Sequence, residues 1–149
     1  MRSSTSFLAI VAPAIISTVF VAVPLESLLS TYQVPTFAFN WYIPWRGAVV
    51  SLILWLVTGA LYSEKRYYLK LSFLGSAVTF AAYHYLILYL VSLREPVRLL
   101  PLFYLVGGNS PLFLDLGQVV LALTALAYRK ELALAFRGPK GSAESSRQP

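Results

Sequence analysis

The sequence predicts an all-α integral membrane protein, a four-helix bundle with both termini in the cytoplasm. Of its 149 residues, 58% are hydrophobic and only 12% are charged, and the mean hydropathy is +0.68. Soluble domains carry about 25% charged residues. The apolar runs are long and do not alternate with polar residues. They favour helices, because a backbone in lipid must satisfy its own hydrogen bonds.

Residues 1–137 are expected to form this single bundle, and residues 138–149 a disordered cytoplasmic tail. The tail reads GPKGSAESSRQP and has no apolar side chain larger than alanine or proline. Such a segment buries too little apolar surface to offset the entropy lost on ordering.

The central helix is predicted over residues 67–92. This stretch lacks proline and, beyond its basic first turn, has one potentially charged side chain, His84. At 1.5 Å rise per residue it exceeds the roughly 30 Å hydrocarbon core. Hydroxyl-bearing residues recur along one face at steps of four, three and four: Ser72, Ser76, Thr79 and Tyr83. We expect this face to pack closely against another helix, with a polar conduit as the alternative.

The first helix is expected over residues 7–29, with Pro13 as a point of local distortion. Its apolar core, residues 7–23, is longer than the roughly 7–15 residues of a signal-peptide core, so we expect it to remain uncleaved; a cleaved signal peptide is the alternative. Residues 30–45 mix aromatic residues with prolines and amides, as is typical of an interfacial aromatic loop. A lid or docking surface is the alternative for this loop.

Two more helices complete the predicted bundle. One covers residues 46–62 and is joined to the central helix by a tight polar turn, so the two helices should be antiparallel neighbours. The other covers residues 111–128, because Ser110 followed by Pro111 is a helix-start signal. Residues 97–106 are too few to span and are expected to lie in the interface, or to re-enter the membrane against the bundle.

The distribution of basic residues sets the predicted orientation. With four spans, one side of the membrane collects Arg2, Lys65, Arg66, Lys70, Arg129, Lys130, Arg137, Lys140 and Arg147, and the other side has Arg46, Arg94 and Arg98. The positive-inside rule therefore puts both termini in the cytoplasm. Because the basic residues flank hydrophobic segments, lipid headgroups explain them and no nucleic-acid binding is expected.

Most of the polar residues near the membrane, Arg46 and Glu95 among them, fall toward the outer side, and six form the candidate binding site: Glu26, His84, Arg94, Arg98, Asp115 and Gln118. An aspartate at the centre of a membrane helix costs about 2.5–3.5 kcal/mol and needs a partner or water. We expect Asp115 to pair with Arg94 or Arg98, and His84 to hydrogen-bond to a neighbouring helix. The alternative is a pocket open to the outer face, where Asp115 and His84 exchange protons or bind a cation or polar solute.

Several chemistries are excluded or unsupported. The chain has no cysteine, which excludes thiol catalysis, disulfides and thiolate metal sites. Its single histidine does not provide the paired axial ligands that membrane cytochromes of the b type use for haem. No catalytic or phosphate-binding motif is present. We therefore predict no catalytic residue, no metal site and no cofactor.

The sequence thus predicts a small multi-pass protein of the cell membrane without catalytic chemistry of its own. We expect it to be a subunit or accessory component of a membrane complex or a homo-oligomer, with the lipid bilayer and other membrane subunits, or itself, as partners. One alternative is an oligomeric transporter or channel that uses the outer-side polar residues. Another is a membrane enzyme acting on a lipid-linked substrate, which requires Glu26, His84 and Asp115 to meet in one pocket.

Overall fold

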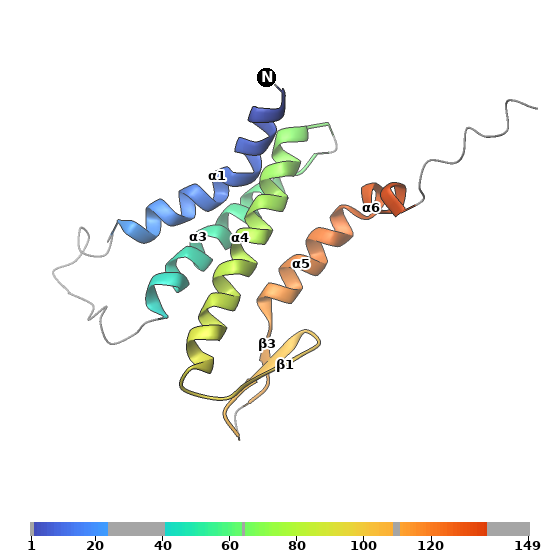
Figure 1. Ribbon diagram of the computed structural model, residues 1–149. Coiled ribbons are helices and arrows are strands. Elements are labelled where there is room, and N and C mark those ends of the chain that lie inside the picture. Colours follow the sequence, from blue (N-terminus) through green and yellow to red (C-terminus); the bar gives the residue numbers. More distant parts are fainter. Residues whose placement is uncertain (1, 24–40, 64, 109–110, 137–149) are drawn as a thin grey trace, which may run out of the picture.

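The computed structural model describes residues 2–23, 41–63, 65–108 and 111–136 (Figure 1). The elements follow in the order α1 (Arg2–Ala22), α3 (Tyr42–Ala60), α4 (Tyr67–Ser92), β1 (Val97–Leu100), β2 (Phe103–Val106), β3 (Phe113–Leu114), α5 (Leu116–Ala127) and α6 (Arg129–Phe136). Most of the described residues are helical, and α1, α3 and α4 are long and apolar enough to cross a membrane.

The helix bounds agree with the sequence in part. α4 covers the expected range, whereas α1 begins in the polar start of the chain and α3 begins at Tyr42, inside the expected aromatic loop. The remainder of that loop and the expected tail lie outside the described residues. α5 begins at Leu116, because Phe113 and Leu114 are paired in a strand and the helix start predicted at Pro111 is not used.

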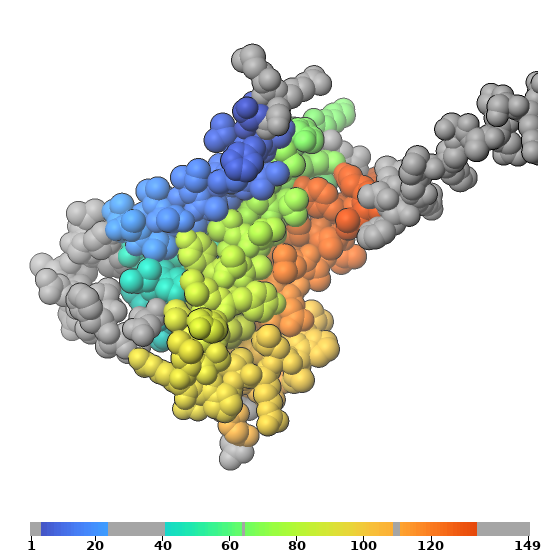
Figure 2. All heavy atoms as spheres, in the orientation of Figure 1, coloured from blue at the N-terminus to red at the C-terminus, as the bar shows by residue number. Residues whose placement is uncertain are grey.

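A small antiparallel sheet, which the sequence analysis did not predict, occupies residues 97–114. Residues 97–106, expected in the interface or as a re-entrant segment, fold into a hairpin in which Val97 pairs with Val106 and Leu100 with Phe103. β3 pairs with β2, giving the order β1-β2-β3. The strands lie where α4 ends and α5 begins, and Figure 2 shows residues of this region at the same end of the molecule (Figure 1; Figure 2). The sheet therefore connects α4 to α5.

The hairpin turn has an unusual backbone. It consists of Pro101 and Leu102, and Leu102 has a φ of 64°. Proline at the first central position is common in turns, but the second position with positive φ usually holds glycine or asparagine. A leucine there is strained by about 1–2 kcal/mol. Contacts from elsewhere in the fold must therefore hold this turn.

α3 and α4 lie side by side and share a core with α5 (Figure 1). That core consists of Ala48, Ala77, Phe80 and Val120. At the opposite end from the sheet, the indole nitrogen of Trp55 donates to the Thr124 hydroxyl at 2.9 Å and so joins α3 to α5. These residues bring α5 against the long helices without any charged contact in the core.

α1 crosses α4 at a point set by a proline and a glycine. Pro13 has no backbone N–H, so the carbonyl of Ala9 loses its usual partner within the helix. The Ser72 hydroxyl donates to that carbonyl at 3.0 Å. Beside it, Gly75 lets α1 approach so closely that an added Cβ would stand 2.1 Å from the carbonyl oxygen of Ile10. One helix thus supplies the hydrogen bond that the other lacks.

The predicted hydroxyl-bearing face of α4 does meet another helix, α1. Besides Ser72, the Tyr83 hydroxyl lies 3.1 Å from Thr18 Oγ1 on α1. Ser76 and Thr79, between them, donate to carbonyls of α4 itself. Tyr83 also contacts α3, because an added Cβ on Gly47 would lie 2.6 Å from its ring. Packing accounts for this face.

Gly75→Ala should separate α1 from α4. The new methyl group would overlap backbone rather than a flexible side chain, so we expect the free energy of unfolding to fall by about 1–3 kcal/mol. Chemical unfolding of the detergent-purified protein, followed by circular dichroism, measures this loss. Gly108→Ala is the matched control, because an added Cβ there meets nothing within 4 Å. Equal losses in the two variants would contradict the assigned contact.

Candidate functional site

Asp115 is the centre of the site and is fully buried. It is the N-cap of α5, where its carboxylate Oδ1 accepts the backbone N–H of Gln118 at 3.0 Å. Oδ2 accepts the side-chain amide of the same glutamine at 2.9 Å, and the Tyr85 hydroxyl lies 3.4 Å from Oδ2. A helix N-terminus favours a negative charge. Asp115 therefore begins α5 while its own charge is compensated locally.

His84 brings α4 to the same carboxylate. Its Nε2 lies 3.1 Å from Oδ1 of Asp115, yet Nε2 has no hydrogen-bond partner in the described part of the chain. The pair is a close contact between nitrogen and oxygen, and it is an ion pair only when the imidazole is protonated. The imidazole packs among aromatic rings, with centroids 5.8 Å from Phe80 and 6.2 Å from Tyr104.

Gly117 makes this contact possible. An added Cβ at this position would lie 2.7 Å from Cδ2 of His84 and 3.2 Å from Cζ of Tyr85. A side chain would therefore push the first turn of α5 away from α4. The sequence analysis did not single out this glycine, since nothing in the local pattern shows which helix faces it.

Gln118 connects the carboxylate to the hairpin turn. Its Oε1 accepts the backbone N–H of Leu102 at 2.8 Å, and its Nε2 also donates to the carbonyl of Leu100 at 3.0 Å. The backbone N–H of Asp115 donates to the carbonyl of Leu102 at 2.8 Å. These three hydrogen bonds hold Leu102 in its strained conformation. We call Asp115, Gln118, His84 and Tyr85 the polar cluster.

The structure brings together half of the residues predicted for the site. His84, Asp115 and Gln118 meet in the polar cluster, whereas Glu26 lies outside the described residues. The expected ion pair of Asp115 with Arg94 or Arg98 is not formed. Arg94 follows the end of α4 and lines a separate hollow, and Arg98 is exposed on β1. The local amide and N-cap donors replace an arginine.

Two tyrosines belong to the surroundings of Asp115 and were missed by sequence reasoning. Tyr85 is a direct neighbour of His84 in sequence, and its hydroxyl reaches the carboxylate. Tyr104 on β2 packs against His84 and stacks on Phe113 with centroids 5.4 Å apart. Burial, and secondarily the negative charge of Asp115, raise the pKa of Tyr104. No spacing in the sequence signals either contact, because both depend on how the sheet folds over α4.

Two hollows are lined by other residues. A groove of about 360 Å³ between α1 and α4 is lined by Ala14, Thr18, Val78, Thr79, Ala82, Tyr83 and Leu86. The other lies between the start of α3 and the end of α4. Neither is lined by His84 or Asp115. Among the residues described, no group of three or more histidine or carboxylate side chains is placed to hold a metal ion.

Comparison with protein-family models, with curated proteins and with solved structures finds no match to this chain.

Asp115→Ala should release the sheet from the helices. It removes the N-cap, worth about 0.5–2 kcal/mol, and takes one acceptor, Oδ2 of Asp115, from the partly buried side-chain amide of Gln118 at a further cost of about 0.5–1.5 kcal/mol. We expect a large loss of stability and faster hydrogen exchange at the Leu102 amide. Asp115→Asn is the matched control: it keeps a capping oxygen and should lose less. Unchanged protection of Leu102 in the alanine variant would show that the cluster does not hold the turn.

Proposed function

We propose that this protein is a small multi-pass subunit of the cell membrane that works through assembly and has no catalytic chemistry of its own. Its partners are the bilayer and either further copies or other membrane subunits. The carrying observation is that the polar groups which the alternative hypotheses would use for chemistry make contacts inside the fold. Asp115 and Gln118 cap α5 and hold the hairpin turn, and both ends of the hydroxyl-bearing face of α4 bind α1.

The apolar exterior supports an assembly function. In the apolar windows of the long helices, the share of buried residues is 39% for α4, 22% for α3 and only 11% for α1. On α1, Phe7, Ile15 and Val19 are each more than half exposed. Large apolar side chains in such numbers need lipid or protein to cover them. α1 offers the least covered face, and we place the partner there.

Four crossings, with both termini in the cytoplasm, complete the proposed topology. α5 has 12 residues and by itself covers about 18 Å, which is less than the hydrocarbon core. The extended residues before it rise about 3.3 Å each and are paired with β2 in part. We therefore assign the fourth crossing to α5 together with residues 111–115. The split of basic residues then follows the positive-inside rule.

Extraction of native membranes in mild detergent, followed by native gel electrophoresis and mass spectrometry, tests the assembly. We expect the chain to migrate with identified membrane subunits or as a defined homo-oligomer. Val19→Trp on the exposed face of α1 should disturb that migration, and Ile53→Trp, at a site of equal exposure on α3, is its control. A monomer free of partners would refute the assembly.

A second candidate function, cation or proton transport, is favoured by one observation. Nε2 of His84 is buried without a hydrogen-bond partner beside the carboxylate of Asp115. If this pair binds the transported ion, Asp115→Asn should abolish flux across proteoliposomes while the protein still assembles. His84→Gln is the companion variant, since it removes only the imidazole. Unchanged flux in both variants would eliminate transport through the pair.

A further inference from the structure

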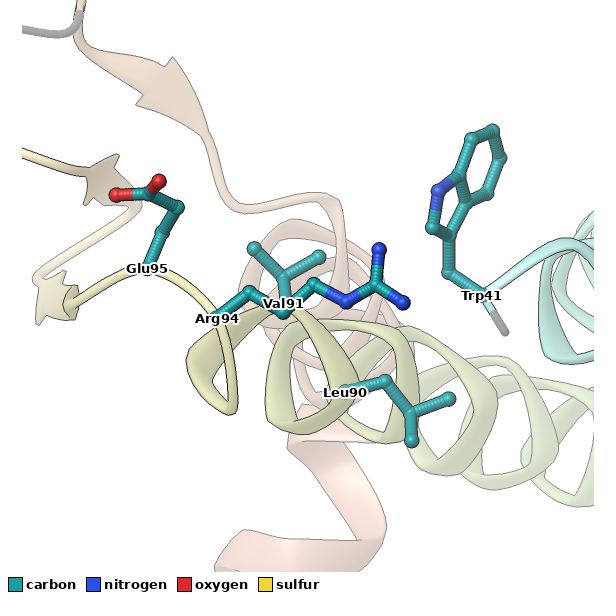
Figure 3. Close-up of a pocket in the computed structure, with 5 residues that line it drawn as sticks. All are labelled: Trp41, Leu90, Val91, Arg94 and Glu95. Carbon is teal, nitrogen blue, oxygen red and sulfur yellow. The ribbon is translucent and has the colours of Figure 1, made fainter. Parts of the chain in front are cut away.

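A second candidate site lies away from the polar cluster, where α3 begins and α4 ends. It is a hollow of about 170 Å³ lined by Trp41, Leu90, Val91, Arg94 and Glu95 (Figure 3). Pockets that enclose drug-sized ligands are about 300–1,000 Å³. This hollow is therefore large enough for a headgroup but not for a whole lipid or a large solute.

The two charged side chains of the hollow point in different directions. Figure 3 shows the Arg94 guanidinium extending toward Trp41, whereas the Glu95 carboxylate points to the opposite side. Within the described residues, the guanidinium of Arg94 has no hydrogen-bond or ion-pair partner. Glu95, the acidic residue next to Arg94 in sequence, therefore does not compensate the positive charge of the guanidinium.

Apolar side chains continue the hollow along α4. Leu90 and Val91 precede the arginine by four and three residues, which is about one helical turn, so both lie close to it beside the hollow. Trp41 stands on the other side, and tryptophan settles where headgroups meet hydrocarbon. A guanidinium binds phosphate oxygens with two parallel N–H donors, which an ammonium cannot do. The hollow thus offers a phosphate donor beside an apolar surface.

We propose that this hollow binds an anionic phospholipid, with the phosphate on Arg94 and an acyl chain against Leu90 and Val91. A free phosphate ion would use the arginine alone and leave the apolar walls unused, which is why we assign a lipid. The proposal rests on the membrane insertion of the proposed function but not on its assembly. The basic residues on the predicted cytoplasmic side attract anionic lipid in general. This proposal instead assigns the lipid phosphate to one side chain, Arg94, and one hollow.

Native mass spectrometry of the full chain in mild detergent tests the site. The probes are phosphatidylglycerol and the zwitterionic phosphatidylcholine, added in equal amounts. The wild-type protein should retain phosphatidylglycerol preferentially, and Arg94→Gln should weaken that retention by roughly tenfold or more. Arg94→Lys keeps the charge but loses the paired donors, so it should fall between them. Arg98→Gln, which removes an exposed arginine from β1, is the matched control and should behave as wild type.

A second measurement locates the lipid and separates it from free phosphate. A phosphatidylglycerol analogue with a photoreactive group near its headgroup should label peptides containing Trp41 or Leu90 and Val91. Millimolar inorganic phosphate should not displace it. Unchanged retention in Arg94→Gln, equal loss in Arg98→Gln, displacement by phosphate, or labelling elsewhere would overturn the site. A chain recovered without membranes or detergent would instead refute the proposed function itself.

Discussion

The Asp115 carboxylate makes the interactions on which the sheet and the start of α5 both depend. It begins α5, contacts His84 on α4, and orders Gln118, whose amide holds the strained turn at Leu102. A buried charge without partners costs several kcal/mol, so this position tolerates an aspartate only if all these donors arrive together. The hydrogen bonds made by Gln118 and by the backbone of Asp115 therefore offset two costs together, the strain at Leu102 and the burial of the Asp115 carboxylate. Neither the sheet nor the first turn of α5 is explained without the other.

Close approach between helices is the second constraint, and glycine provides it where α4 meets α1, α3 and α5. Gly75 admits the backbone of α1, Gly47 admits the ring of Tyr83, and Gly117 admits the ring of His84. In lipid, apolar burial does not drive helices together, so short distances and interhelical hydrogen bonds must do so. The hydrogen bond from Ser72 is such a case: Pro13 leaves the carbonyl of Ala9 without a partner in α1, and the Ser72 hydroxyl on α4 donates to it.

The sequence predicted those features that depend on local pattern. α4 follows from a long apolar run without proline, and the closeness of Asp115 and Gln118 follows from their spacing of three. The hairpin escaped prediction because its left-handed position holds leucine rather than glycine. The prediction that Asp115 pairs with an arginine was wrong, because the backbone N–H and the side-chain amide of Gln118 already donate to both carboxylate oxygens. The roles of Tyr85 and Gly117 could not be predicted, because their contacts depend on how α4 and α5 pack and not on a spacing along the sequence.

The remaining unsatisfied polar atoms bear on where activity can reside. In the described segments, the buried side-chain nitrogen and oxygen atoms without a hydrogen-bond partner are Nε2 of His84 and Oγ of Ser17. They stand on different helices and line neither of the two hollows. A transport path would need such atoms to connect through water, whereas the polar groups between them are paired within or between helices. In the proposed function, recognition falls to the exterior, and the apolar face of α1 and the Arg94 hollow are the surfaces proposed for protein and lipid.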